Sequence, residues 1–247
     1  MMRYKLTIEY DGRPFCGWQR QSGQPSVQET LEQAAAALDG RPVTVFGAGR
    51  TDTGVHATGQ VAHIDLSTPR DADTVADALN FHMRPAPVAV LEAEAVSEDF
   101  HARFSATGRH YRYTIINRRA DLTVENGLAW RVAQPLDAEA MHAAAQALLG
   151  HHDFTTFRDT QCQAESALRT LDAIAVRRRD ARIEMTCSAR AFLHRQVRSM
   201  VGSLVEVGRG KRRPEWIEEI LGAADRTACG PVAPPDGLYL TAVDYAD

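Results

Sequence analysis

The sequence lacks the features that mark several common classes of protein. Its cysteines, Cys16, Cys162, Cys187 and Cys229, are widely spaced and form no C-x-x-C pair, which gives no support to a zinc ribbon or a redox motif. No apolar run is long enough to span a bilayer, and the N-terminus enters an alternating pattern without an apolar signal core. We therefore expect reduced thiols, no membrane association and a cytoplasmic location.

The usual motifs for cofactors and metals are missing as well. Residues 49–54 have the glycine spacing of a P-loop, but Val55 and His56 follow where that loop requires Lys and Ser or Thr. G-x-G-x-x-G, G-x-S-x-G and H-E-x-x-H do not occur. His151 and His152 are adjacent, so in a strand they would point to opposite faces and make a poor metal site. The sequence predicts neither a dinucleotide cofactor nor a metal.

Positive charge is in deficit overall, but it gathers in the last third of the chain. The formal net charge is −4, which argues against a generally basic nucleic-acid-binding protein. An acidic chain can nevertheless carry a basic face. Each run, taken alone, is equally compatible with solvated strand ends and loops. The residues concerned are Arg177, Arg178, Arg179, Arg190, Arg195, Arg198, Arg209, Lys211, Arg212 and Arg213.

Two alternating stretches, 3–10 and 110–117, each open one half of the chain. Each half later adds helices and paired strands, so we predict an α+β protein with two RRM/ferredoxin-like halves, 1–105 and 106–247. Their antiparallel or mixed sheets are expected side by side, with helices packed on one face and an active-site cleft between the halves. We expect helices near 27–38, 72–81, 137–150, 192–207 and 214–221, and further strands near 43–46, 60–66, 88–95, 167–177, 181–188 and 238–243.

The stretch richest in candidate functional features is the glycine-rich loop from Gly47 to His56, which joins two expected strands. Its glycines permit positive φ angles and close backbone approach. Asp52 has two interpretations here. It either hydrogen-bonds its own loop as an Asx-turn, or it is an ionised nucleophile whose pKa the neighbouring Arg50 lowers.

The expected helix 192–207 carries an arginine at the margin of its apolar stripe. That stripe contains Leu193, Val197, Met200, Val201 and Leu204. An arginine at this margin, Arg198, either extends its charged end to solvent or pairs with a carboxylate, for which an aspartate on a loop is a natural partner.

The loop 49–56 resembles the signature of the TruA family, the tRNA pseudouridine synthases that act on the anticodon stem-loop. Thr53 stands where alanine is usual and Gln196 where methionine is common, and neither change removes a chemical group used here. Further matching motifs cover nearly the whole chain: Tyr10–Gly12, Phe15, Gly17–Gln19, Ser26–Gln28, Phe100–Ala106, Tyr111–Tyr113, Asp153–Arg158, Phe192–Leu193, Gln196–Arg198, Met200–Gly202 and Ala233–Tyr239.

The resemblance implies isomerisation of uridine to pseudouridine at tRNA positions 38 to 40, without cofactor or metal. It makes Asp52 the nucleophile, which attacks C1′ of the ribose or C6 of the uracil, or, by a third route, abstracts a ribose proton. Arg50 would fill the space left by the flipped nucleotide, and Tyr111 would stack on the target base. Arg198 would pair with Asp52.

The resemblance also implies a homodimer in which one tRNA reaches across both subunits. The basic residues of the last third, with Arg13, Arg20 and Arg109, would contact phosphates. A non-catalytic tRNA-binding protein with the same fold is the alternative function. A metal-free hydrolase that uses Asp52 as its base is weaker, because no second carboxylate or histidine is clearly paired with it in the sequence.

Overall fold

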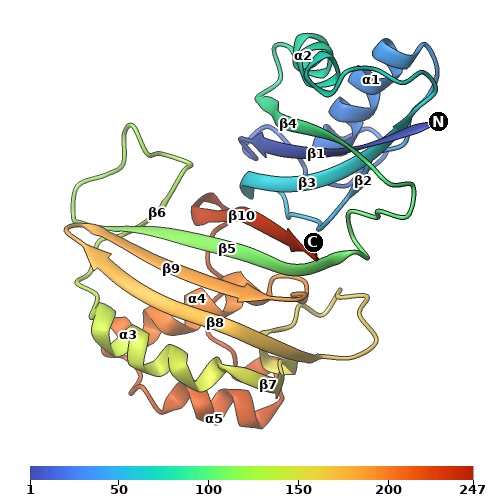
Figure 1. Ribbon diagram of the computed structural model, residues 1–247. Coiled ribbons are helices and arrows are strands. Elements are labelled where there is room, and N and C mark those ends of the chain that lie inside the picture. Colours follow the sequence, from blue (N-terminus) through green and yellow to red (C-terminus); the bar gives the residue numbers. More distant parts are fainter. Residues whose placement is uncertain (247) are drawn as a thin grey trace. The chain divides into compact units, whose positions relative to one another are not determined.

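The computed structural model describes residues 1–246, which fall into two compact units. Unit 1 comprises Met1–Thr107 together with the chain from Tyr239 onward, and unit 2 comprises Gly108–Leu238. Each unit combines a β-sheet with helices (Figure 1), so the predicted α+β class is confirmed. Within the described residues, no helix is both long enough and apolar enough to cross a membrane.

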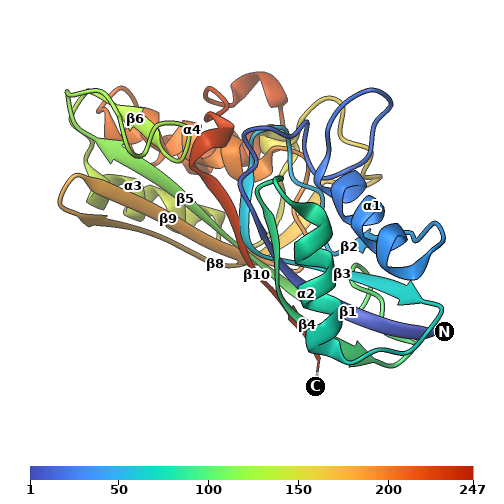
Figure 2. The ribbon, with the colours of Figure 1, turned by 90° about the horizontal axis from the view of Figure 1, so that it is seen from above.

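Unit 1 is a sheet with a pair of helices on one face (Figures 1 and 2). Its strand order is β4-β1-β3-β10, and the short β2 pairs with β3. β1 is antiparallel to both β3 and β4, whereas β10 is parallel to β3. The elements are β1 (Met2–Tyr10), α1 (Val27–Asp39), β2 (Phe46–Gly47), β3 (His56–Leu66), α2 (Ala72–Met83), β4 (Val88–Val96) and β10 (Leu238–Tyr245).

Local sequence signals account for the main elements of unit 1. Tyr4, Leu6 and Ile8 alternate along β1 and are fully buried, as the period of two predicts. The Ser26 hydroxyl accepts a hydrogen bond from the backbone N–H of Glu29 at 3.2 Å, which fixes the start of α1. Gly40 ends this helix in the left-handed conformation at φ 75°. Strand β1 and helix α1 were therefore readable from sequence.

The other face of the unit 1 sheet has a small core of its own. His63 on β3 is only 1% exposed, and its ring stacks on Phe46 with 4.9 Å between ring centroids. Its Nδ1 accepts a hydrogen bond from the backbone N–H of Ala102 at 3.1 Å. Burial, with the positive charges of Arg3 and His101, lowers the pKa of His63 to about 4. The imidazole is therefore held neutral.

Unit 2 is a sheet in the order β5-β9-β8-β7, with β6 parallel to β5 and helices on one side (Figure 1). Tyr113, Ile183 and Met185 are buried on the face that the helices cover. The strands are β5 (Ala106–Asn117), β6 (Trp130–Val132), β7 (Gly150–Asp153), β8 (Leu168–Arg179) and β9 (Arg182–Ala189). The helices are α3 (Ala138–Ala145), α4 (Gln196–Gly208) and α5 (Trp216–Ala223), with 3-10 turns η1 (Gln146–Leu148), η2 (Thr155–Phe157), η3 (Arg226–Ala228) and η4 (Pro235–Gly237).

The last strand pairs with a partner far away in the sequence. Strand β10 was expected with the half 106–247, but Tyr239 is in parallel register with His56 of β3, and Leu240 with Ala57. From Tyr239 onward the chain therefore belongs to unit 1. Periodicity reveals that a strand exists, but it carries no information on which distant strand it will join.

Helix α4 begins at Gln196, four residues later than expected. Arg195 adopts the left-handed conformation at φ 58°, which cannot continue a right-handed helix. The side-chain Oε1 of Gln196 accepts a hydrogen bond from the backbone N–H of Leu193 at 2.8 Å and fixes the preceding turn. Because Leu193 fits the apolar stripe, the periodic pattern continues upstream of the true helix start, and the predicted helix therefore begins too early.

We expect the buried neutral His63 to make unit 1 sensitive to acid. An unfolded histidine binds its proton near pH 6.5 and His63 only near pH 4, so stability is lost as pH falls through this window. His63→Asn keeps an acceptor for Ala102 but cannot titrate. Between pH 7 and 5, the wild type should lose about 2 kcal/mol more unfolding free energy than H63N, measured by urea unfolding. Equal losses would contradict a neutral buried imidazole.

Candidate active site

Asp52 lies in the loop that connects β2 to β3. Its side chain is half-buried, whereas that of Arg50 is exposed. The backbone N–H of Val55 donates to the carbonyl oxygen of Asp52 at 3.1 Å and closes a turn. Gly54 has φ +77°, a conformation that favours glycine, so it permits this turn. The loop therefore presents a carboxylate and a guanidinium two residues apart.

Hydrogen bonds hold the loop on the side that precedes Asp52. The hydroxyl of Tyr10 lies 2.8 Å from the hydroxyl of Thr51, and the backbone N–H of Trp18 donates to the Thr51 carbonyl at 3.0 Å. The side-chain amide of the buried Gln60 donates to the Gly49 carbonyl at 2.8 Å. Burial raises the pKa of Tyr10 to about 12, although hydrogen bonds with Thr51 and Gln60 oppose this. The phenol therefore stays protonated at neutral pH.

Two glycines outside the loop allow other backbone segments to approach it. A Cβ on Gly12 would lie 2.0 Å from the carbonyl oxygen of Val55. A Cβ on Gly17, whose φ is +96°, would lie 2.6 Å from the carbonyl oxygen of Thr51. Side chains other than hydrogen cannot fit at such distances. The backbone around Asp52 is thus packed directly against the chain that follows β1.

His56 fixes the side of the loop that follows Asp52. Its Nδ1 accepts a hydrogen bond from the backbone N–H of Gly12 at 3.1 Å and lies 3.3 Å from a carboxylate oxygen of Asp11. Its ring stacks on that of Tyr239, with 4.7 Å between centroids. Burial would raise the pKa of Asp11, but the hydrogen bonds and the positive charge of Arg13 hold it below its usual value. Asp11 is therefore ionised beside the imidazole.

Tyr111 lies on β5 of unit 2, opposite Cys187 of β9. Its half-buried ring meets the ring of Phe192 edge to face, with 5.1 Å between centroids and an interplanar angle of 85°. Edge-to-face contacts of this kind fix the orientation of a ring. Phe192 comes from the turn before α4, so the late helix start leaves this aromatic side chain free to pack beside Tyr111.

Arg198 lies in the first turn of α4, and the segment Cys229–Gly237 runs along this helix. The Nε of Arg198 donates to the carbonyl of Ala233 at 2.8 Å, and the Ala233 N–H donates to the Arg198 carbonyl at 3.0 Å. A Cβ on Gly202 would lie 1.6 Å from the carbonyl oxygen of Pro231. The contact between α4 and this segment therefore requires glycine and sets the direction of the guanidinium.

Tyr113 holds the same segment from the side of the sheet. Its hydroxyl donates to the carbonyl of Pro234 at 2.8 Å. Burial raises the pKa of Tyr113 well above its usual value, the charge of Asp236 adds to the shift, and the charge of Arg198 opposes it. The hydroxyl is therefore a permanent donor at neutral pH.

The structure thus places the sequence-predicted site residues in two groups. Asp52 and Arg50 lie on one loop of unit 1, whereas Tyr111 and Arg198 lie on neighbouring elements of unit 2. Sequence reasoning assigned no role to the residues that hold these groups in place. Most of these residues lie in motifs that the sequence shows, but their contacts join segments far apart in the chain and cannot be inferred from local patterns. These supporting residues are Tyr10, Gly12, Gly17, His56, Gln60, Tyr113 and Ala233.

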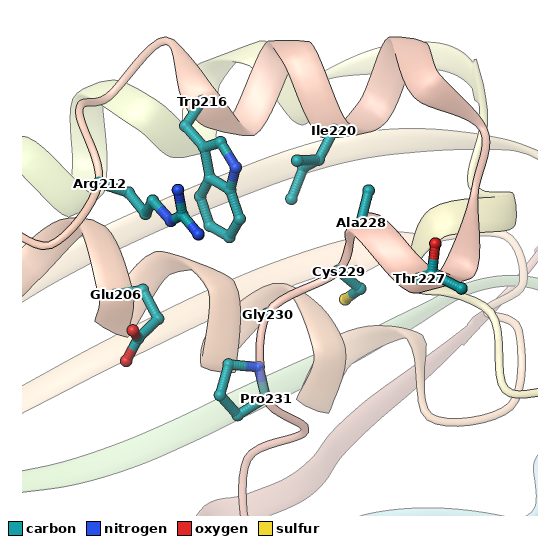
Figure 3. Close-up of a pocket in the computed structure, with 9 residues that line it drawn as sticks. All are labelled: Glu206, Arg212, Trp216, Ile220, Thr227, Ala228, Cys229, Gly230 and Pro231. Carbon is teal, nitrogen blue, oxygen red and sulfur yellow. The ribbon is translucent and has the colours of Figure 1, made fainter.

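Unit 2 also has a surface pocket of about 390 Å³ where α4 and α5 meet the segment around Cys229 (Figure 3). The guanidinium of Arg212 lies over the ring of Trp216, 5.0 Å from its centroid. The carboxylate of Glu206 is engaged in ion pairs with Arg209 and Lys211. The negative charge of this carboxylate is therefore balanced by the two cations that follow α4, and Glu206 is a poorer candidate for chemistry than Asp52.

Comparison with known proteins identifies clear relatives. A family model described as tRNA pseudouridine synthase matches residues 6–105 and 144–246. The tRNA pseudouridine synthase A of Maricaulis maris is 67% identical over 245 residues, which cover 99% of this chain and 98% of the relative. The proteins of the same name from Hyphomonas neptunium and Rhodopseudomonas palustris strain HaA2 are 64% and 61% identical, with 99% of this chain covered in each case.

We expect Gly12→Ala to destabilise the protein, because its methyl group would displace the carbonyl of Val55. Overpacking of this kind costs about 1–3 kcal/mol. Gly49→Ala is the matched control, since a Cβ on Gly49 meets nothing within 4 Å. Urea unfolding should show the loss in G12A and a change within about 0.5 kcal/mol in G49A. If the two variants were equally stable, the close approach described here would be incorrect.

Proposed function

The chain belongs to the tRNA pseudouridine synthase family, and on this premise we propose that Asp52 is its catalytic nucleophile. The protein is an isomerase that converts uridine to pseudouridine in tRNA. The observation that supports a role for Asp52 is the construction of its loop. Buried groups anchor the backbone on both sides of this carboxylate, while the side chain itself is only half-buried. A rigid backbone beneath an accessible reactive group is what a nucleophile requires.

The reaction rearranges bonds without oxidation or reduction. The N1–C1′ bond of uridine breaks, the uracil turns, a C5–C1′ bond forms, and the proton on C5 is lost while N1 gains one. Asp52 attacks either C1′ of the ribose, where the new C5–C1′ bond later displaces the carboxylate, or C6 of the uracil, from which the carboxylate is eliminated at the end. Abstraction of a ribose proton is the third route. The role requires an ionised carboxylate and needs no redox cofactor.

We propose that the target uridine leaves the RNA stem before it reacts. Extruding a base costs a few kcal/mol. Arg50 is exposed two residues before Asp52, which supports the proposal that its guanidinium enters the space that the nucleotide leaves. In the same scheme Tyr111 stacks on the flipped base, with its ring orientation fixed by Phe192. Arg198 is the proposed counter-ion of the Asp52 carboxylate.

The proposed substrate is the anticodon stem-loop at positions 38 to 40, and the proposed working form is a cytoplasmic homodimer. The motifs quoted from the sequence support this choice. Phosphate contacts are proposed for Arg13, Arg20 and the basic residues of the last third. Arg109 does not belong with them, because it is only 8% exposed and its guanidinium donates to the Arg190 carbonyl at 2.6 Å.

We expect Asp52→Asn to abolish pseudouridine formation, because an amide is not a nucleophile, while tRNA affinity stays within a few-fold of the wild type. Release of tritium from tRNA labelled at C5 of uridine measures turnover, and filter binding measures affinity. Asp77→Asn, a change at an exposed aspartate on α2, is the control and should behave as wild type.

Turnover by D52N near the wild-type rate would show that another group is the nucleophile. Tritium retention by the wild type, together with tRNA binding, would instead favour the non-catalytic tRNA-binding protein. Tritium release and tRNA binding together therefore distinguish the two failures. A map of pseudouridine in tRNA from cells with and without the protein would test positions 38 to 40.

We expect Tyr111→Phe to bind tRNA normally but to turn over more slowly. The phenyl ring keeps the stacking face, whereas the lost hydroxyl is the group that we propose assists removal of the C5 proton. Deuterium at C5 should therefore slow Y111F more than it slows the wild type. An equal isotope effect in both proteins would limit Tyr111 to stacking.

A further inference from the structure

His56 lies where the Asp52 loop enters strand β3, four residues after the proposed nucleophile. It is only 1% exposed. A buried histidine in this position needs a physical reason, because burial of a polar ring is costly unless its nitrogens are satisfied. The contacts of Nδ1 supply that reason.

The Nδ1 atom of His56 must be unprotonated in this structure. The backbone N–H of Gly12 donates to it at 3.1 Å, and an N–H donor requires a lone pair on its partner. The proton of the neutral ring therefore sits on Nε2. The Asp11 carboxylate oxygen, 3.3 Å from Nδ1, is a close neighbour of the acceptor and not its hydrogen-bond partner in this tautomer.

The ring is also prevented from turning. The Tyr239 ring lies 4.7 Å away at an interplanar angle of 18°, and the backbone of Tyr239 is in parallel register with that of His56. Strand β10 thus carries the aromatic side chain that orients the imidazole. The Nδ1 atom is held toward Gly12.

A short chain of contacts joins this nitrogen to Asp52. Gly12, held by Nδ1, packs against the carbonyl of Val55, where even a Cβ would lie at 2.0 Å. The N–H of Val55 in turn donates to the Asp52 carbonyl at 3.1 Å. Gly12 and Val55 are in direct contact. If Gly12 shifted after losing its hydrogen bond to Nδ1, it would therefore displace Val55 and weaken the hydrogen bond from Val55 to Asp52.

We propose that His56 is a positioning residue for the reaction, which acts through the neutral Nδ1 acceptor that ties the Asp52 loop to the end of β1. This inference rests on the proposed role of Asp52. Errors of about 1 Å in the position of a reacting group cost on the order of 100-fold in rate. His56 therefore determines turnover without touching the substrate.

Two amide variants separate positioning from simple packing. In His56→Asn the side-chain oxygen can occupy the place of Nδ1, whereas in His56→Gln the amide reaches the place of Nε2. Neither side chain titrates, and both remove the aromatic ring. We expect H56Q to lower kcat about 30- to 100-fold at unchanged KM for tRNA, and H56N to keep kcat within about 5-fold of the wild type.

The assay is tritium release under saturating tRNA, with urea unfolding of each variant as a separate readout. Equal kcat values for H56N and H56Q, or losses that follow stability alone, would overturn the proposal. If H56Q does not fold, Tyr239→Leu is the second variant, because it removes the stacking that orients the ring. Y239L should lower kcat at unchanged KM, and wild-type kcat in that variant would also overturn the proposal.

The outcome is independent of the test of Asp52 itself. If wild-type protein releases tritium and D52N does as well, the proposed nucleophile fails whatever the His56 variants do. If D52N is inactive and the two His56 amides behave alike, only the positioning role fails.

Discussion

The contact between the end of β1 and the turn after Asp52 is the constraint on which the proposed site depends. Gly12 lies so close to the carbonyl of Val55 that no side chain fits there. A hydrogen bond between the hydroxyls of Tyr10 and Thr51, and another from the Gly12 N–H to His56, then fix the loop on either side of Asp52. A carboxylate on a glycine-rich loop would otherwise be mobile, and mobility is costly for a nucleophile that must meet one carbon atom.

In unit 2, the backbone that carries Arg198 is held in place by a segment that lies along α4. The segment Cys229–Gly237 lies against α4, where Gly202 permits the approach, and its Ala233 backbone exchanges hydrogen bonds with Arg198. Tyr113 fixes the same segment from the sheet. In both units a charged side chain proposed to act on RNA projects from backbone that is immobilised by glycine contacts and a buried tyrosine.

Much of the fold could be predicted because its signals are local. Alternation gave β1 and β5, and a serine cap with a terminal glycine gave α1. The late start of α4 was missed, because the left-handed Arg195 leaves no mark in the apolar pattern. The pairing of β10 with β3 was missed because a strand does not encode its distant partner. Asp52 was found from its motif, whereas the contact of His56 with Gly12 joins residues 44 positions apart and had no signal in one sequence.

The central claim is that the carboxylate of Asp52 attacks the nucleotide. A tRNA with 5-fluorouridine at the target position tests it most directly, because fluorine makes C5 a poorer nucleophile and cannot leave as a proton, so a bond between Asp52 and the nucleotide is expected to accumulate. Mass spectrometry of the digested complex would then locate any covalent link. The account predicts a link on the peptide that contains Asp52, and its loss in D52N. A link to a different side chain would contradict it.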